Sequence, residues 1–145
     1  MKADFTDFLR LNEFLQALSD GAINNQAQAV MNGALAYEAD VKRAAPVDTG
    51  DYRARIRSDP GGTILGSPIV LIGSPHPQVR QLEFGGTISA KNGEYLTFKT
   101  KDGQWHRVKE VFQPAKPHWR PAWDLNNLHY ADIMYATLMK DVVMK

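Results

Sequence analysis

Hydrophobic side chains in the first 45 residues recur at the spacing of two amphipathic helices. The first set is spaced by three, four and three residues, which predicts a helix over residues 1–20 with Thr6 or Asp4 as its cap. This set is Phe8, Leu11, Leu15 and Leu18. The helix is expected to end near Gly21, and a longer helix is predicted over residues 24–45. One face of the second helix carries Ala27, Val30, Ala34, Tyr37 and Val41.

A proline and a turn sequence interrupt the helical pattern after residue 45. Pro46 cannot donate a backbone hydrogen bond, and Asp48, Thr49 and Gly50 are residue types that turns use. Beyond this turn, apolar residues alternate with arginines, which predicts a half-buried strand over residues 52–58 with one apolar and one basic face. The apolar positions are Tyr52, Ala54 and Ile56, and the basic positions are Arg53, Arg55 and Arg57.

The second half of the chain predicts strands followed by one helix. After the breaker at residues 60–62, the apolar run 69–72 is expected to pair with the strand at 52–58. Residues 73–81 are expected to form a loop, with at most a short helical turn leading into Leu82 and Phe84. Asp102-Gly103 separates two alternating segments and predicts a hairpin over residues 94–111. Pro121 suits the first turn of a helix over residues 121–143. The apolar stripe of that helix is Leu128, Ala131, Tyr135, Leu138 and Val142.

Together these elements predict an α+β fold with a single domain over residues 1–145. The N-terminal helices and the C-terminal helix are expected to pack on an antiparallel sheet within residues 51–112, from which the hairpin projects. A chain of 145 residues is long enough to bury a core without a disulfide or a metal.

Composition narrows the classes of function. The chain has no cysteine, which excludes a disulfide framework, a thiol nucleophile and a zinc–thiolate site. A formal charge of +1 is too small for tight nucleic-acid binding through bulk electrostatics. The longest purely apolar run, residues 69–72, is too short to cross a bilayer, and the first residues predict neither a signal peptide nor a membrane anchor. We therefore expect no membrane association.

Side chains with catalytic or metal-binding chemistry are present but scattered. The four histidines lack the one-turn spacing of a helical metal site, which favours solvated or interface roles for them. They are His76, His106, His118 and His129. Asp48 and Thr49 are expected to satisfy turn amides, and Glu83 is expected to pair with an arginine such as Arg53 or Arg120. We therefore expect no enzymatic activity, no metal and no cofactor.

Three motifs resemble landmarks of the HK97 gp10-like family of tailed-phage neck and tail-completion proteins. They are Ala-Pro-Val-Asp-Thr-Gly at residues 45–50 followed by Tyr52 and Arg53, Glu-Phe-Gly at 83–85, and Pro-Ala-Lys-Pro-His-Trp-Arg-Pro-Ala at 114–122. The motifs occur in the family's order, and the resemblance spans residues 11–140. The matching positions are Pro46, Asp48, Thr49, Gly50, Arg53, Glu83, Phe84, Gly85, Pro117, Arg120 and Pro121.

Two positions depart from the family pattern. Residues 75–79 stand where the family often has a tyrosine before Glu-Phe-Gly. His118 occupies the first of two positions after Pro117 that are usually apolar.

The resemblance implies a structural virion protein of a tailed phage or prophage, without catalysis. It implies a tail-completion or neck subunit that forms a ring, a hexamer or a dodecamer, at the head-proximal end of the tail and joins the tail to the head. The implied partners are copies of the chain, other neck and tail proteins, and DNA that passes through the ring without specific binding. The implied location is the virion, and the host cytoplasm during assembly.

Two alternatives stay open at this level. The first is a minor tail or virion-morphogenesis factor that acts during assembly and is not retained as a stoichiometric ring. The second is a small nucleic-acid-binding protein in which the basic strand and the hairpin aromatics form a stacking platform.

Two surfaces are candidate interfaces. The first is the basic face of the strand at 52–58, for which three interpretations stay open: it is solvated, it meets a neighbouring subunit, or it meets DNA phosphates. Further basic residues that add to this face are Arg80, Lys99, Lys101, Arg107 and Lys109. The hairpin aromatics either dock on another chain or extend the local sheet. Of Trp119 and Trp123, one is expected to be buried and the other to lie near a partner. The candidate interface residues are Arg53, Arg55, Arg57, Tyr95, Phe98, Trp105 and Trp119.

Overall fold

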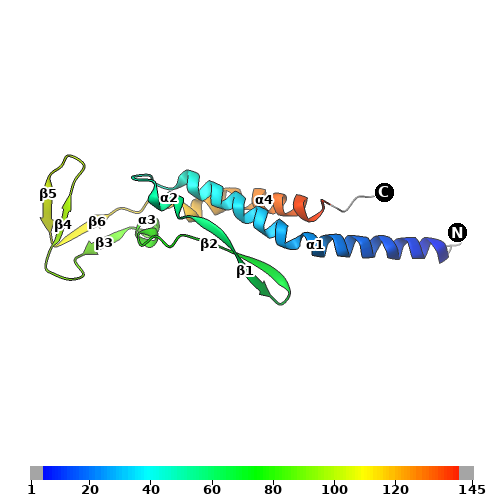
Figure 1. The fold of residues 1–145 in the computed structure, drawn as a ribbon. Coiled ribbons are helices and arrows are strands. Elements are labelled where there is room, and N and C mark those ends of the chain that lie inside the picture. Colours follow the sequence, from blue (N-terminus) through cyan, green and yellow to red (C-terminus); the bar gives the residue numbers. More distant parts are fainter. Residues whose placement is uncertain (1–4, 141–145) are drawn as a thin grey trace.

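Four helices and six strands form an elongated α+β molecule in a computed structural model that describes residues 5–140, with side chains from residue 12 on (Figure 1). The helices are α1 (Phe5–Ala44), α2 (Asp51–Ala54), α3 (Val79–Phe84) and α4 (Trp119–Leu138). The strands are β1 (Arg57–Ile64), β2 (Ser67–Gly73), β3 (Gly86–Ser89), β4 (Leu96–Lys99), β5 (Trp105–Val108) and β6 (Glu110–Gln113). The predicted α+β class is confirmed. The strands pair as three antiparallel ribbons, β1–β2, β3–β6 and β4–β5, instead of one sheet.

α1 is one continuous helix of 40 residues, so the predicted break near Gly21 is wrong. A glycine inside a helix costs about 1 kcal/mol relative to alanine, and good helix formers on both sides carry the helix through it. At 1.5 Å per residue, α1 is about 60 Å long. The helix ends before Pro46, as predicted. The side chains of Phe8 and Leu11 and the proposed cap Asp4 lie outside the described part of the chain.

The segment after the turn is helical at first, so the predicted strand at 52–58 is wrong. Residues 51–54 form the single turn of α2, in which the Ala54 amide donates to the Gly50 carbonyl at 3.0 Å. Tyr52 and Ile56 are both buried, whereas Ala54 between them is exposed. A strand would have placed all three residues on the same face.

The β1–β2 hairpin lies beside α1 (Figure 1). Its strands pair from Arg57–Gly73 to Ile64–Ser67, with a register shift between Pro60 and Thr63. Residues 69–72 do lie in a strand that pairs with the preceding one, but Ser58 is the one residue of the predicted 52–58 strand that pairs with this run. β1 includes the glycines at 61 and 62, which were expected to break the strand. The tip residue Leu65 has a φ of +50° and is fully exposed at 101%.

Residues 86–113 form an arm that projects from the rest of the molecule, at the end opposite the N-terminus (Figure 1). β3 and β6 pair along its base, and β4 and β5 form the outer hairpin. The hairpin predicted around Asp102-Gly103 is confirmed, and Gly103 has the positive φ of +87° that the turn requires.

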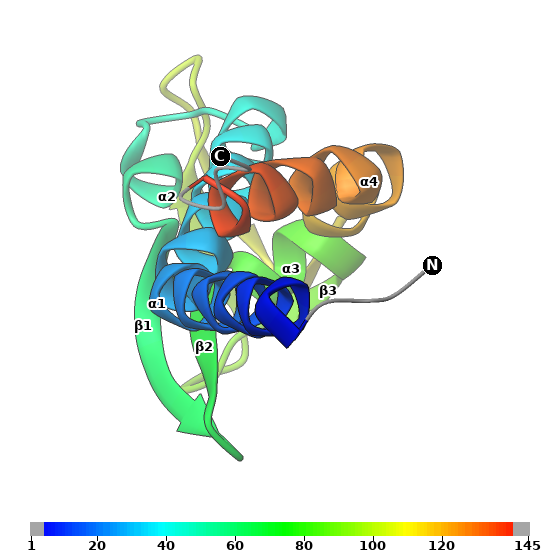
Figure 2. The same ribbon diagram turned by 90° about the vertical axis from the view of Figure 1, so that its right-hand side faces the viewer.

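α4 packs along the C-terminal half of α1 in the opposite direction (Figure 2). The amide side chain of Asn32 donates to Thr137 Oγ1 at 3.1 Å, and that of Asn126 donates to Asp40 Oδ2 at 3.1 Å. A Cβ atom on Gly33 would lie 2.6 Å from Met134 Cγ, so this glycine permits the close approach of the two helices. The N-terminal half of α1 continues past α4 (Figure 1). We call its first twenty residues, 5–24, the α1 overhang.

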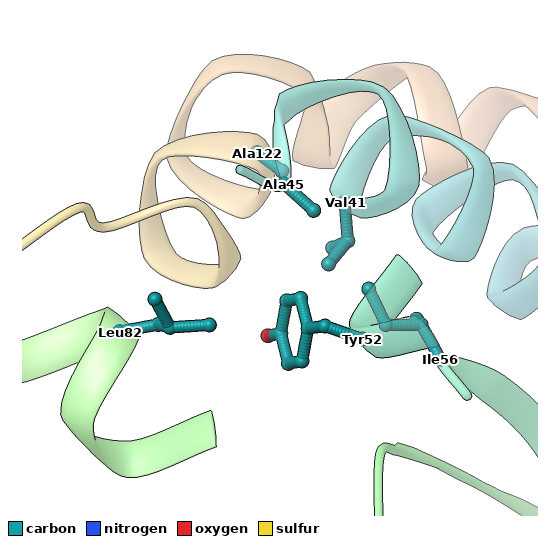
Figure 3. Packing of buried hydrophobic residues seen from close by; sticks show 6 residues of the cluster. All are labelled: Val41, Ala45, Tyr52, Ile56, Leu82 and Ala122. Atoms are coloured by element: carbon teal, nitrogen blue, oxygen red, sulfur yellow. The ribbon is translucent and has the colours of Figure 1, made fainter. Parts of the chain in front are cut away.

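The core lies where α1, α2, α3 and α4 meet (Figure 3). The ring of Tyr52 is enclosed between Leu82 of α3 and the end of α1. Burial of such side chains stabilises the fold by about 1.5–3 kcal/mol each. The cluster consists of Val41, Ala45, Tyr52, Ile56, Leu82 and Ala122.

Candidate functional site: the motif cluster and the exposed surfaces

The three sequence motifs converge on one buried cluster. Tyr52 comes from α2, Glu83 from α3, and His118 from the residue that precedes α4. His118 is 1% exposed and Glu83 is 9% exposed. Polar groups buried to this extent need hydrogen-bond partners, because each unsatisfied group costs free energy.

The Glu83 carboxylate caps the N-terminus of α4. It accepts hydrogen bonds from the backbone amides of His118 (2.9 Å), Trp119 (3.1 Å) and Arg120 (3.1 Å). The next residue, Pro121, has no amide hydrogen, so one carboxylate satisfies the orphan donors that begin this helix. Burial alone would raise the pKa of Glu83, but these three amides hold it below its usual value.

The expected pairing of Glu83 with an arginine is wrong. Its partners are backbone amides that only the fold brings together. Arg53 donates instead to the Ala45 carbonyl at 3.4 Å, and the Arg120 side chain is exposed.

Tyr52, His118 and Trp119 form a hydrogen-bond chain with one consistent direction. His118 Nδ1 lies 2.8 Å from the Lys116 carbonyl, which can only accept, so in the neutral ring Nδ1 carries the proton. Nε2 then accepts from the Tyr52 hydroxyl at 2.5 Å, and the Tyr52 oxygen accepts from Trp119 Nε1 at 2.9 Å. Burial raises the pKa of Tyr52, which keeps the hydroxyl protonated as this chain requires.

His118 therefore has a structural reason to stand at a position that the family usually fills with an apolar residue. Its ring packs edge-on against the Tyr52 ring, with 5.3 Å between the ring centres, and the His76 ring packs against the same tyrosine with 5.5 Å between the ring centres. His76 belongs to the segment 75–79, which stands where the family often has a tyrosine. Sequence reasoning gave neither histidine this role, because their shared partner Tyr52 was assigned to a strand.

Replacing Tyr52 with phenylalanine is expected to lower the free energy of unfolding by about 1–3 kcal/mol, because it leaves His118 Nε2 and Trp119 Nε1 without their partner. Urea denaturation would measure the loss. Tyr135→Phe, at an exposed tyrosine, is the matched control and should change stability by less than about 0.5 kcal/mol. Equal stabilities of the two variants would contradict the proposed hydrogen-bond chain.

The turn residues connect the core to the arm. Asp48 forms an exposed ion pair with Lys101 of the arm at 2.8 Å, and the pKa of Asp48 is lowered by this contact. Thr49 Oγ1 accepts from the Asp51 amide at 3.4 Å, as expected for a turn residue. Gly50 has a φ of +87°. A polar cleft of about 400 Å³ lies between this turn and the arm.

The other motif positions lie around the cluster. Gly85 ends α3 just before the arm, Phe84 before it is 68% exposed, and Pro117 is exposed beside the buried His118. Pro121 lies in the first turn of α4, as predicted.

The predicted basic strand face does not exist. Arg53 and Arg55 belong to α2 and its end, and Arg57 begins β1. Arg55 pairs with Asp51 at 2.9 Å, and Arg57 pairs with Asp59 at 2.8 Å. These exposed ion pairs contribute little stability. Their carboxylates partly neutralise the charge that the arginines could offer to a partner.

The arm exposes aromatic and basic side chains together. Trp105 and Phe112 are each 71% exposed, while Tyr95 and Phe98 are exposed to a smaller extent. The Arg107 guanidinium lies 4.3 Å from the centre of the Tyr95 ring. Such groups are enriched at protein interfaces.

The apolar stripe of α4 is largely exposed. Leu128 is 78% exposed, and Tyr135 is also exposed. The buried side of α4 carries Ala122 and Tyr130, whose hydroxyl donates to Asp40 at 2.8 Å. Burial and that carboxylate raise the pKa of Tyr130 to about 12. Val142 lies outside the described residues.

The two tryptophans at the start of α4 differ in exposure. Trp119 is half-buried, and Trp123 is 51% exposed. Both rings pack edge-on against Tyr37 of α1. Trp119 thus belongs to the motif cluster, and its place among candidate interface residues stays a prediction.

Comparison with known families assigns the chain to one of them. Residues 10–85 match the family model described as "Bacteriophage HK97-gp10, putative tail-component", which is more than half of the chain. The chain belongs to this family of bacteriophage tail components. The matched range includes the turn motif and Glu-Phe-Gly, whose glutamate caps α4 beyond the matched range. No curated protein and no solved structure gave a significant match.

Two further findings concern the described residues. Between residues 5 and 140, no helix is both long and apolar enough to span a membrane. Over the same part of the chain, no group of three or more acidic or histidine side chains could hold a metal ion.

Proposed function

We propose that this tail component is a tail-completion or neck subunit. It forms a homo-oligomeric ring at the head-proximal end of the tail and joins the tail to the head. Its partners are copies of itself, other neck and tail proteins, and DNA that passes through the ring without specific binding. Family membership supports the tail assignment, and the finer role rests on the surfaces of the subunit.

The observation that carries the proposal is the exposure of large apolar side chains at both ends of an elongated subunit. One set lies on the arm and includes Trp105, and another lies on the α1 overhang and includes Leu15 at 53% exposed. Exposed apolar groups gathered on projecting elements are typical of surfaces that become buried in an assembly. A closed ring requires two different surfaces that meet in a head-to-tail manner, and an elongated subunit with two such ends supplies them.

The subunit is proposed to act through contacts, without catalysis. The buried motif side chains of Glu83 and His118 hydrogen-bond to backbone groups and to Tyr52, and so hold the helices together. The motifs therefore maintain the shape that presents the arm and the overhang.

Disrupting this gene in its phage or prophage is expected to yield filled heads separated from tails, or tails with an aberrant head-proximal end. Electron microscopy of the induced lysate would measure this, with the intact gene supplied in trans as the control. Intact, infectious particles would reject the joining role. The number of copies per purified particle separates a ring subunit from an assembly factor that is not retained.

A further inference from the structure

We propose that the arm of one copy binds the α1 overhang of the next copy through one basic-aromatic face and one acidic face. The inference rests on the proposed ring, because it names the two surfaces that a head-to-tail contact requires. Its evidence is the charge and side-chain pattern of the two ends of the molecule.

The outer hairpin of the arm has one face without a carboxylate. Thr97 lies opposite Arg107 and Lys99 lies opposite Trp105, so these four side chains project from the same side of the ribbon. Tyr95 joins them through its contact with the Arg107 guanidinium at 4.3 Å. These five residues form the basic-aromatic face, on which two cations flank an exposed tryptophan.

The part of the α1 overhang whose side chains the structure describes has the opposite charge. Residues 12–24 contain Glu13 and Asp20 and no lysine or arginine. Because these carboxylates are seven residues apart on one helix, they lie on the same side, about 10 Å apart. Ala17 lies between them, and Phe14, at 40% exposed, lies beside them. We call Glu13, Phe14, Ala17 and Asp20 the acidic face.

The two faces fit each other in charge, spacing and shape. Lys99 and Arg107 are diagonal neighbours on paired strands, about 7–8 Å apart, and their long side chains reach carboxylates about 10 Å apart. The small Ala17 leaves room for the ring of Trp105. Opposite charges at an interface fix the partner and its orientation.

A second copy is the partner because one chain cannot bring the faces together. The arm and the overhang lie at opposite ends of the molecule (Figure 1), and α1 is one uninterrupted helix that also packs against α4. Each bound copy leaves its other face free for the next one, which gives a heterologous interface that can close into a ring.

Charge reversal at either face should weaken self-association at least about tenfold, because like charges then meet across the contact. The arm variant is Lys99→Glu with Arg107→Glu, and the helix variant is Glu13→Lys with Asp20→Lys. Sedimentation of concentrated protein would measure association. Mixing the two variants in equal amounts, or combining all four substitutions in one chain, should restore it. Lys91→Glu and Asp132→Lys reverse exposed charges outside both faces and are the matched controls.

Cysteine cross-linking tests the contact directly, since the chain has no native cysteine. A chain with Thr97→Cys and Ala17→Cys should give an oxidation-dependent ladder of multimers, in purified protein or in particles. The pair Thr63→Cys and Ala17→Cys, with Thr63 on the β1–β2 hairpin, should give none. Absence of the first ladder in both samples, or equal ladders from both pairs, would overturn the proposed contact.

Genetic complementation separates this inference from the proposed function. If gene disruption separates heads from tails but both charge-reversed variants complement it fully, the contact is refuted and the joining role stands. If disruption leaves particles intact, the joining role fails and cross-linking still reports on the contact. If the arm variant loses salt-dependent binding to single-stranded DNA while its self-association is unchanged, the face binds nucleic acid and the contact is also refuted.

Discussion

Replacing Gly85 with alanine is expected to lower the free energy of unfolding by about 3 kcal/mol or more. Gly85 has φ +67° and ψ −167°, a backbone region that is essentially reserved for glycine. A Cβ atom there would lie 2.6 Å from the Ala115 nitrogen and 2.9 Å from the Gln113 carbonyl oxygen. These are backbone atoms of the segment 113–115, which passes directly beside Gly85. The Lys116 amide donates to the Leu82 carbonyl at 2.7 Å and holds this segment in place, so its atoms cannot move aside without a cost in free energy.

Gly103→Ala is the matched control for this substitution. Gly103 also has a positive φ, of +87°, but the nearest atom to its added Cβ would be the flexible end of Lys99 at 3.8 Å. It should cost about 1–2 kcal/mol, from backbone conformation alone. Chemical denaturation of both variants measures the difference. If Gly85→Ala is no less stable than Gly103→Ala, the backbone of residues 113–115 does not constrain position 85.

Replacing Glu83 with alanine is expected to cost about 3 kcal/mol, because three amides at the start of α4 lose their shared acceptor. Glu83→Gln should cost less than Glu83→Ala, since its side-chain oxygen can still accept from part of this group. Glu94→Gln, at an exposed carboxylate in the arm, is the control and should be nearly neutral. Urea denaturation near neutral pH would rank the three variants.

Acid should remove the same contribution. The folded-state pKa of Glu83 is lowered from its usual value of 4.5, so the stabilisation is present above about pH 4.5 and is lost as the pH falls through the folded-state pKa. The stability difference between the unmodified chain and Glu83→Gln should therefore shrink at low pH. A difference that stays constant from neutral to strongly acidic pH would show that the carboxylate charge does not stabilise α4.

Elements specified by neighbouring residues could be predicted, and elements decided by distant contacts could not. Pro46 ends α1 and Asp102-Gly103 turns the outer hairpin, because both signals act within a few residues. The strand predicted around Tyr52 failed because apolar residues at 52 and 56 fit one turn of helix as well as a strand. Packing of both residues against α1 selects the helical turn, and nothing within residues 52–58 encodes that contact.

The motif cluster was identified by its residues but not by its chemistry. The positions of Glu83 and Gly85 are explained by backbone atoms about 30 residues away, which have no side-chain signature in the sequence. The apolar stripe of α4 could be predicted, but its exposure could not, because a stripe indicates only that apolar residues share one side of a helix and not what covers that side. Leu128 is the clearest example.

The pairing of α1 with α4 has a consequence for how the chain matures during synthesis. α1 ends at residue 44 and α4 begins at residue 119, so the whole segment between them is synthesised before the two helices can meet. Until then, Tyr52 and the side of α1 that packs against α4 lack the cover that α4 supplies, and contacts between such distant segments form slowly. A chain that stalls or is truncated before α4 emerges would therefore present the features that chaperones and proteases recognise. Closure of the core between α1 and α4 therefore waits for the synthesis of α4.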